Sequence, residues 1–361
     1  MPRYMARSPV EIALEISPRA RIDLVDILGR VSAIHGDVLD PFPRTLYSSF
    51  HTTAGYLEQS LATRLSQKRN GLDHYLSFFR NVFPEGAGYK HDEMHLREEL
   101  SEAQRRVEPP NADSHLAFIS AGLRSCVTYR HRRGEPVYLI DLDGVNDGRP
   151  RQRVTTVLGF NTEEEVARGR IEVPMSAHPV DSINLKDPSF GIYQHCQELI
   201  TRHDVAKGRI QLTLAPGEDQ AGLTVNEYET LLMQHDLAEV IHNPFRFMAE
   251  KSRHLLADPR AIPNKTIGYA KYDMVRVFNQ VVDTLKLSNS ILEQIISRFF
   301  VGAPARHFLR MKRSVSLPVS DRDTPGEGRV AQGRYQSPIL VQWRRAEQRT
   351  RIVDITLTRF R

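Results

Sequence analysis

The stretch TLYSSFHTTAG, residues 45–55, carries the pattern that indicates the fold of the first half of the chain. Leu46, Ser48 and Phe50 alternate with the residues between them, and His51 follows. Successive side chains of a strand point to opposite faces of a sheet, so this alternation predicts a strand. We therefore expect a strand that ends at His51.

Outward from this strand, the first half of the chain mixes strand and helix patterns. Apolar residues between Ile22 and Val31 recur at helical spacing, which predicts a helix ending near Gly36. The other expected elements are a strand at 10–16, helices at 72–81, 96–107 and 111–123, and closing strands at 136–144 and 153–160. Such a mixture, closed by two consecutive strands, predicts an α+β fold.

The second half repeats this order. The expected elements are a strand at 170–175, a helix at 190–201, a strand at 208–216 that ends in a turn leading to AGLTVNE at 221–227, helices at 228–241 and 273–300, and closing strands at 337–343 and 351–360. The segment 320–333 is the most loop-like part of the chain.

The composition is that of a globular protein with room for two domains. The chain has 361 residues, of which 40% are hydrophobic and 26% charged. It has no apolar run of about 18 residues and no signal-peptide pattern, so we expect no membrane span and a cytoplasmic location. Cys126 and Cys196 are the only cysteines, which argues against a disulfide framework and a cysteine-rich zinc site.

The net charge of +5 is modest for this length. Basic residues alternate with acidic ones, as in HLREELSEAQRR at 95–106, which is typical of a solvated helix face. A nucleic-acid surface would need clustered Lys and Arg with stacking aromatic residues. The sequence therefore argues against nucleic-acid binding.

Three separated motifs in the first half occur in a recognisable order. They are HTTAG at 51–55, YKHDE at 89–93 and NADSHL at 111–116. Together they resemble the motifs of YjbQ-like proteins, a family known for secondary thiamine-phosphate-synthase activity. Members of that family are small α+β proteins that generally assemble as trimers, so the resemblance implies a homo-oligomer here.

The second half resembles a diverged copy of the same domain. AGLTVNE at 221–227, GYAKYDM at 268–274, RHFLRMKRSVSLPV at 306–319 and the last two strands return in the order of the first half. We therefore expect two tandem YjbQ-like domains, each a mostly antiparallel sheet with packed helices. The expected domains are residues 1–165 and residues 166–361, the second with helical insertions.

The two copies depart from the family pattern at different positions. The first copy keeps three histidines but has Gln59-Ser60 where the family has Asn-Glu. The second copy keeps Asn226-Glu227 and has His307 at the third histidine, but it has Tyr272 in place of the second and Pro216-Gly217 near the place of the first. Complementary loss suggests one site that draws on both copies. The alternative is that the second copy is only a structural partner.

His51, His91 and His115 are the candidate metal ligands. Imidazole is the commonest metal ligand, and three histidines with a water form a known catalytic zinc arrangement. The spacing alone favours three unrelated polar histidines, since no HxH or HExxH pattern occurs. The resemblance favours a divalent metal ion, with zinc as the first candidate, which would polarise a phosphoryl or carbonyl oxygen.

The candidate substrate-binding residues each have a structural alternative. Thr52 and Thr53 can bind a ligand or simply fit a strand. Arg149, Arg151 and Arg153 follow the polar turn VNDGRP at 145–150 or belong to it, and would share one face if the chain is extended there; guanidinium groups in such a row suit a phosphate or merely solvate an edge. Asn111 can face a ligand or cap the helix that follows it.

The function that these residues favour is a metal-dependent enzyme for a small phosphorylated or heterocyclic substrate. The resemblance implies a transferase that displaces pyrophosphate; a metal-dependent hydrolase or lyase is a further possibility. Asn226, Glu227 and Asp236 are the candidate catalytic residues, although surface carboxylates are common. The alternative is a non-catalytic metabolite-binding or assembly protein on the same duplicated fold.

Overall fold

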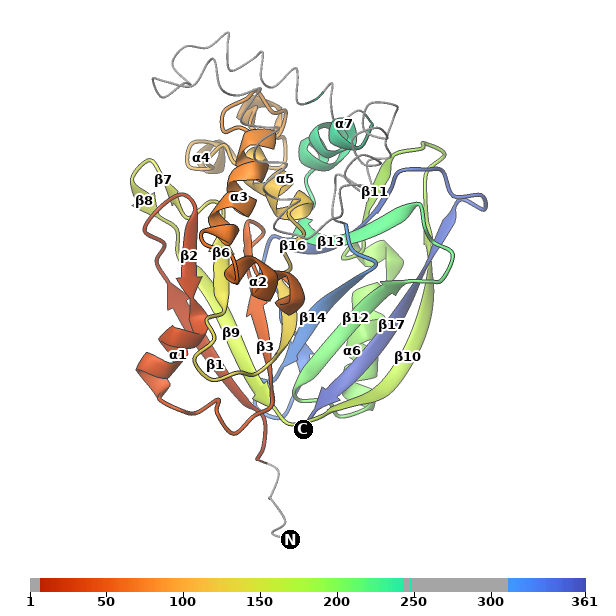
Figure 1. The fold of residues 1–361 in the computed structure, drawn as a ribbon. Helices are drawn as coiled ribbons and strands as arrows, with labels where there is room; N and C mark the ends of the chain where they lie inside the picture. Colours follow the sequence, from red (N-terminus) through yellow and green to blue (C-terminus); the bar gives the residue numbers. More distant parts are fainter. Residues whose placement is uncertain (1–6, 243–246, 248–310) are drawn as a thin grey trace, which may run out of the picture. The chain divides into compact units, whose positions relative to one another are not determined.

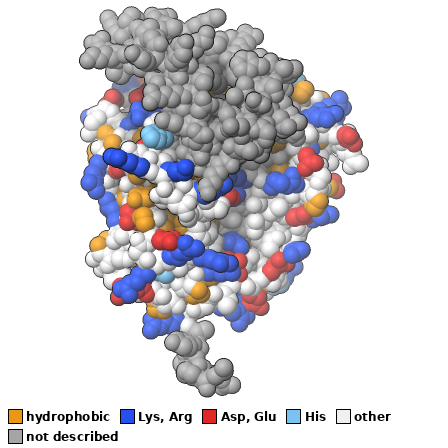
Figure 2. Space-filling model, in the orientation of Figure 1, with side chains coloured by type: hydrophobic (Ala, Val, Ile, Leu, Met, Phe, Trp, Pro, Cys, Tyr) orange, Lys and Arg blue, Asp and Glu red, His pale blue; other side chains and the backbone are white. Residues whose placement is uncertain are grey.

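The computed structural model describes residues 7–242, residue 247 and residues 311–361. None of the helices in these ranges is both long enough and apolar enough to span a membrane. On the face drawn in Figure 2, Lys and Arg side chains are interspersed with Asp and Glu. The expected helix at 273–300, the GYAKYDM motif, Tyr272 and His307 lie outside the described residues.

The first half of the chain forms two antiparallel sheets (Figure 1). The larger sheet has the order β1-β9-β3-β5, with strands Val10–Ile16, Arg153–Phe160, Arg44–Ser49 and Cys126–Arg130. The smaller sheet has the order β2-β6-β4, with strands Asp23–Asp26, Tyr138–Asp141 and Ala54–Gly55. Helix α1 (Ile27–His35) begins at Asp26, whose side chain accepts the backbone N–H of Gly29, and Gly36 ends it.

The second half repeats this topology and adds one edge strand to its larger sheet. Its larger sheet has the order β10-β17-β12-β14-β15, with strands Glu163–Pro174, Thr350–Phe360, Gly208–Leu214, Ser314–Ser320 and Arg329–Val330. Its smaller sheet has the order β11-β16-β13, with strands Asp181–Asn184, Gln336–Gln342 and Ala221–Glu227. The 3₁₀ turn η2 (Pro188–Phe190) and helix α6 (Ile192–Arg202) follow β11, as α1 follows β2.

The register of the strands agrees between the halves as well. Ala54 pairs with Asp141, and Ala221 pairs with Gln342. Isolated bridges join Tyr56 to Arg124 and Leu223 to Lys312. The expected α+β fold of two tandem copies, each with mostly antiparallel strands, is therefore confirmed. The boundary at 165/166 lies inside β10 and stays a prediction.

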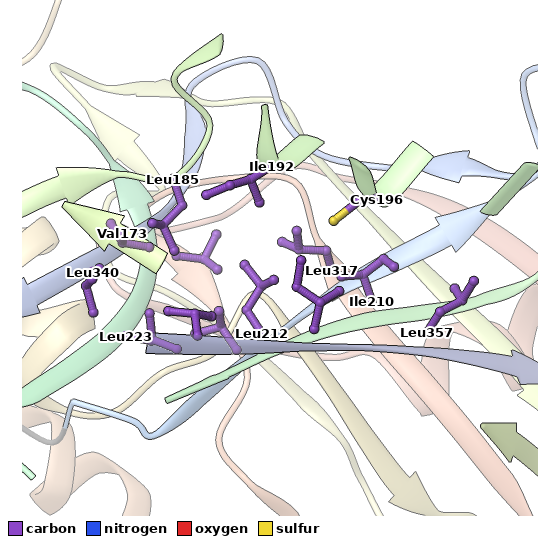
Figure 3. Packing of buried hydrophobic residues seen from close by; sticks show 14 of the residues in the cluster. Val173, Leu185, Ile192, Cys196, Ile210, Leu212, Leu223, Leu317, Leu340 and Leu357 are labelled. Carbon is purple, nitrogen blue, oxygen red and sulfur yellow. The ribbon is translucent and has the colours of Figure 1, made fainter. Parts of the chain in front are cut away.

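The cores of the two halves differ in character. The second half has a wholly apolar core between α6 and the sheets, with Leu212, Leu223 and Leu317 at its centre (Figure 3). The first half buries a tyrosine cluster beside its aliphatic residues: the ring centroid of Tyr47 lies 5.6 Å from that of Tyr56 and 5.5 Å from that of Tyr129. Tyrosine hydroxyls need partners when buried, which makes this core more polar.

Two compact units cut across the two halves of the sequence. One comprises residues 1–58, 123–228 and 312–361, which hold all the sheets; the other comprises residues 59–122 and 229–311. In the first unit the ring of Phe160 stacks on Phe360 with 4.0 Å between centroids. These aromatic residues, with Leu46, Cys126 and Leu158, form a small cluster that joins the larger sheets of both halves.

The second unit is helical where the structure describes it. Its elements are α2 (Gln59–Ser66), α3 (Gly71–Val82), η1 (Met94–Leu96), α4 (Glu102–Arg105), α5 (Ala112–Ser120), the π-helix η3 (Leu231–Asp236) and α7 (Leu237–His242). The expected helix at 96–107 is wrong, since only α4 forms there and Ser101 caps it. The segment carries no buried apolar face that would hold a longer helix.

The expected strand at 153–160 forms as β9 and begins at Arg153. Arg149, Arg151 and Arg153 do not share one strand face, because β7 (Val145–Asn146) and β8 (Arg149–Pro150) form a separate hairpin before β9. Asp147 and Gly148 both have positive φ, as a two-residue hairpin turn requires.

Candidate functional site

His51 lies between the end of β3 and the start of β4, in the sheet unit. The backbone N–H of Val154 in β9 donates to Nε2 of His51 at 2.7 Å. Because Nε2 accepts a hydrogen bond, its lone pair is engaged, and the ring proton of the neutral imidazole is on Nδ1. Among the described residues, Nδ1 has no hydrogen-bond partner.

The charge state of His51 follows from its surroundings. Burial, together with the smaller effect of the nearby guanidinium groups of Arg153 and Arg151, lowers the pKa of His51 to about 3. His51 is therefore a neutral hydrogen-bond donor at physiological pH, and it is a poor proton acceptor.

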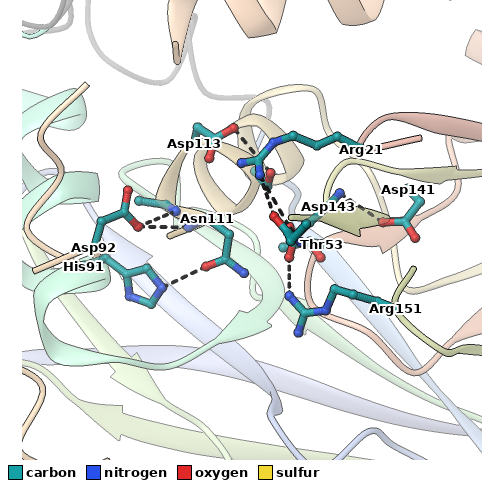
Figure 4. A network of polar contacts seen from close by, with 12 residues as sticks. Arg21, Thr53, His91, Asp92, Asn111, Asp113, Asp141, Asp143 and Arg151 are labelled. Atoms are coloured by element: carbon teal, nitrogen blue, oxygen red, sulfur yellow. Dashed lines mark hydrogen bonds and ion pairs between the residues drawn. The ribbon is translucent and has the colours of Figure 1, made fainter. Parts of the chain in front are cut away.

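Arg153 is the buried centre of a polar network (Figure 4 draws part of it). Its guanidinium group forms a two-point ion pair with Asp141, at 2.7 Å and 2.9 Å. The same group donates to the carbonyl of Asp143 at 2.6 Å and to Oγ1 of Thr53 at 3.3 Å. These contacts use most of the N–H donors of Arg153. Its main contribution to a ligand would therefore be positive electrostatic potential rather than direct hydrogen bonds.

Arg151 lies at the outer edge of this network. Its guanidinium group pairs with the carboxylate of Asp143, which is fully buried, while 34% of the Arg151 side chain stays exposed. Asn146 also donates to Asp143, at 2.6 Å, and Arg21 lies 3.9 Å from it. A buried carboxylate thus fixes a guanidinium group that still faces solvent.

The other predicted substrate-binding residues are placed differently. Arg149 is exposed on the β7–β8 hairpin, paired with Asn146 through the backbone alone. Thr52 accepts a hydrogen bond at its carbonyl from Nδ2 of Asn226 at 3.2 Å. Thr53 is buried against Arg153.

His91 lies in the helical unit, where it is completely buried. Its Nδ1 is 2.8 Å from Oε2 of Glu229, and its Nε2 is 3.2 Å from Oδ1 of Asn111 (Figure 4). Both ring nitrogens therefore have oxygen partners within the protein, and an imidazolium would satisfy both. Asn111 stands at the start of α5, where its side chain makes no capping bond.

Carboxylates hold the backbone around His91. Asp236 accepts the backbone N–H groups of Lys90 and His91, at 3.0 Å and 2.9 Å. Glu229 accepts those of Leu231 and Leu232, and its hydrogen bond to His91 helps to lower the pKa of Glu229 against the opposing effect of burial. Buried backbone donors must be paired, so these carboxylates have a structural task.

His115 is buried in α5, and its ring centroid lies 5.2 Å from that of His91. The structure thus brings two of the three predicted metal ligands together in one unit. His51 belongs to the other unit, together with Asn226 and Glu227.

The contacts of the histidines do not fit a three-histidine metal centre. A metal ion needs an imidazole lone pair, yet Nε2 of His51 accepts from Val154 and both nitrogens of His91 face oxygen atoms. Across the described residues, no group of three or more His, Cys, Asp or Glu side chains is arranged to hold a metal ion. Zinc binding stays a prediction that this geometry does not support.

Sequence reasoning missed several residues that shape both clusters. Asp141 and Asp143 interrupt the apolar run YLIDLDG at 138–144, and such polar residues inside a strand pattern were a usable signal. Glu229, Glu218 and Gln336 gave no local signal, because their partners are distant in the sequence.

Comparisons with known proteins give structural matches over about half of the chain. No family model and no curated protein sequence matches it. A YbjQ-like protein of unknown function from Sulfolobus solfataricus P2 is 12% identical, with 55% of this chain and 99% of that chain covered and a TM-score of 0.29. A hypothetical protein from Aeropyrum pernix K1 is 14% identical, covering 53% and 98%, with a TM-score of 0.28.

A third structure is an uncharacterized conserved protein of the YjbQ family from Clostridium acetobutylicum. It is 10% identical, covering 52% of this chain and 98% of that chain, with a TM-score of 0.26. Two of these three descriptions name the YjbQ-like family whose motifs the first half resembles. The printed descriptions of these proteins name no activity.

Proposed function

We propose that this chain binds a small phosphorylated metabolite, whose phosphate or pyrophosphate group lies against Arg151 and His51. One observation carries the proposal. The guanidinium group of Arg151 is anchored by the buried Asp143 and still faces solvent, and it is near enough to His51, whose ring proton is on Nδ1, to help lower the pKa of that imidazole.

These groups suit an anion by their chemistry. A guanidinium group offers several N–H donors that match phosphate oxygens. A neutral Nδ1–H adds one further donor, and the buried Arg153 adds positive potential behind both. All of these groups are pre-positioned by partners within the fold, so little ordering is needed when the anion binds.

The resemblance to thiamine phosphate synthases extends the proposal to a transferase that displaces pyrophosphate. Arg151 and His51 would then stabilise the negative charge on the departing group. The proposed reaction contains no metal-dependent step, because the contacts of the three histidines do not fit a metal centre. A cytoplasmic homo-oligomer, with the trimer implied by the resemblance, belongs to the same proposal.

A second candidate, a non-catalytic metabolite-binding protein, is favoured by one observation. The lone pair of His51 is engaged by Val154, and the low pKa of about 3 makes this imidazole a poor general base. Release of pyrophosphate from a substrate that carries a diphosphate ester, together with transfer of the remaining group to an acceptor, would distinguish the transferase from the binding protein.

Titration calorimetry with inorganic pyrophosphate at pH 7.5 tests the binding site. The Arg151→Met variant should bind at least about tenfold more weakly, because a hydrogen bond to a charged group contributes about 1.5–3 kcal/mol. Arg170→Met is the matched control, since Arg170 is also paired with an aspartate, Asp354, but lies on β10. Equal affinity in wild type and Arg151→Met would contradict the proposal.

A further inference from the structure

The segment 50–53 of the first copy lies between strands β3 and β4, so its backbone needs partners from outside the sheet ladder. Several of these partners are side chains of the second copy. Both sets of residues belong to the sheet unit.

Gln336, at the start of β16, forms hydrogen bonds through both the nitrogen and the oxygen of its side-chain amide. Its Nε2 donates to the carbonyl of Ser49 at 2.9 Å and to the carbonyl of His51 at 2.8 Å. Its Oε1 accepts the N–H of Gly333 at 3.0 Å. The reversed amide would set an oxygen against two carbonyl oxygens, so the contacts themselves fix its orientation. The side chain is 2% exposed.

Two further residues of the second copy hold the same segment. Nδ2 of Asn226 donates to the carbonyl of Thr52, and Oδ1 of Asn226 accepts the N–H of Glu227. Gly333 packs so closely that a Cβ atom there would lie 1.9 Å from the carbonyl oxygen of Phe50. The second copy thus contacts four consecutive backbone positions, 49 to 52.

We propose that Gln336 is a positioning residue for His51, so that the anion site of the first copy depends on a side chain of the second. The inference rests on the proposed function for its effect on binding. Its effect on the imidazole is independent of any ligand.

The reason is that the imidazole is held at two points. The N–H of Val154 in β9 fixes Nε2, and the amide of Gln336 fixes the carbonyl of His51. Loss of the second point frees the backbone of His51 to move away from β9. The hydrogen bond from Val154 then lengthens, and the Nδ1–H group of His51 loses its fixed orientation.

The test compares Gln336→Asn with a matched control, Gln197→Asn. Both substitutions shorten a glutamine by one methylene, and Gln197 donates to the carbonyl of Gly328 at 3.0 Å, away from His51. Imidazole ¹⁵N NMR spectra at pH 7.5, without ligand, report which nitrogen of His51 carries the proton. Calorimetry with pyrophosphate then gives the affinity.

We expect wild type and Gln197→Asn to show the Nδ1–H form of His51 alone. Gln336→Asn should show a mixture of both forms and bind pyrophosphate roughly three- to tenfold more weakly. If Gln336→Asn fails to fold, Gly333→Ala displaces the same segment and should give the same mixture.

An unchanged His51 spectrum in a folded Gln336→Asn or Gly333→Ala would overturn the positioning role, whatever the affinity. A changed spectrum in a protein that does not bind pyrophosphate even as wild type would support the positioning role and reject the proposed function. The two failures are therefore distinguishable.

Discussion

His51 and Glu218 occupy equivalent positions in the two copies. The N–H of Val154 donates to Nε2 of His51 at 2.7 Å, and the N–H of Ile352 donates to Oε1 of Glu218 at 3.0 Å. Arg153 and Arg351 also correspond. Arg153 donates to the backbone carbonyl of Asp143, and Arg351 donates to that of Arg344, each at 2.6 Å. The second copy has thus kept the arginine and exchanged the imidazole for a carboxylate.

This exchange predicts one anion per chain. Glu218 pairs with Arg351 at 2.6 Å and would repel an incoming phosphate, whereas His51 offers it an N–H donor. Calorimetry with pyrophosphate should therefore give a stoichiometry near one per chain. A stoichiometry near two, halved by Arg351→Met, would show that the second copy also binds.

The ion pair of Arg153 and Asp141 should be a major contributor to the stability of the sheet unit. Both side chains are buried, so Asp141→Asn leaves a buried guanidinium group without its counter-charge, and the expected loss is about 3–5 kcal/mol in the free energy of unfolding. Asp354→Asn, which breaks the more exposed pair with Arg170, should cost no more than about 1 kcal/mol. Urea denaturation of both variants measures the two losses in unfolding free energy. Similar losses would contradict the burial of the Arg153–Asp141 pair.

The low pKa of His51 predicts how stability varies with pH. An ordinary histidine titrates near pH 6.5 in the unfolded chain, whereas His51 titrates near pH 3 in the fold. Between these values the unfolded state binds more protons, so stability should fall as pH falls from about 6.5 towards 3.

The variant His51→Gln keeps an acceptor for Val154 without a titrating group. Its urea midpoint should therefore decline less over this pH range than that of wild type. Parallel curves for the two proteins would mean that His51 titrates normally.

Phe160 and Phe360 should couple the folding of the two copies. Their rings stack at 4.0 Å with an angle of 7° between planes. Each Phe→Ala substitution should cost about 3–5 kcal/mol. A double-mutant cycle by urea denaturation should give a coupling energy of about 0.5–1.5 kcal/mol. Strictly additive losses would indicate that the copies fold independently.

The strands and their repeat were predictable because their signals are local. The alternation around Leu46 and the closing strands at 337–343 and 351–360 depends on which residues face a core, and β3, β16 and β17 form there. Asp147-Gly148 carries a local turn signal, and the turn that forms there separates Arg149 from Arg153.

The site was less predictable because its contacts connect distant residues. His51 was found through its motif, but Asp143, Glu218 and Gln336 act through partners that only the folded sheets bring near. The buried His91 similarly meets Glu229, two residues after the predicted Glu227. Glu227 itself is half-buried at the end of β13.

The most direct test of the central claim is an NMR titration that follows the imidazole of His51 while inorganic pyrophosphate is added. The account predicts that the Nδ1–H resonance of His51 shifts and saturates with the calorimetric affinity, while Nε2 keeps its hydrogen bond to Val154. It also predicts that Arg151→Met weakens this saturation by at least about tenfold. Saturable binding that leaves the His51 resonances unchanged, or no binding at all, would contradict it.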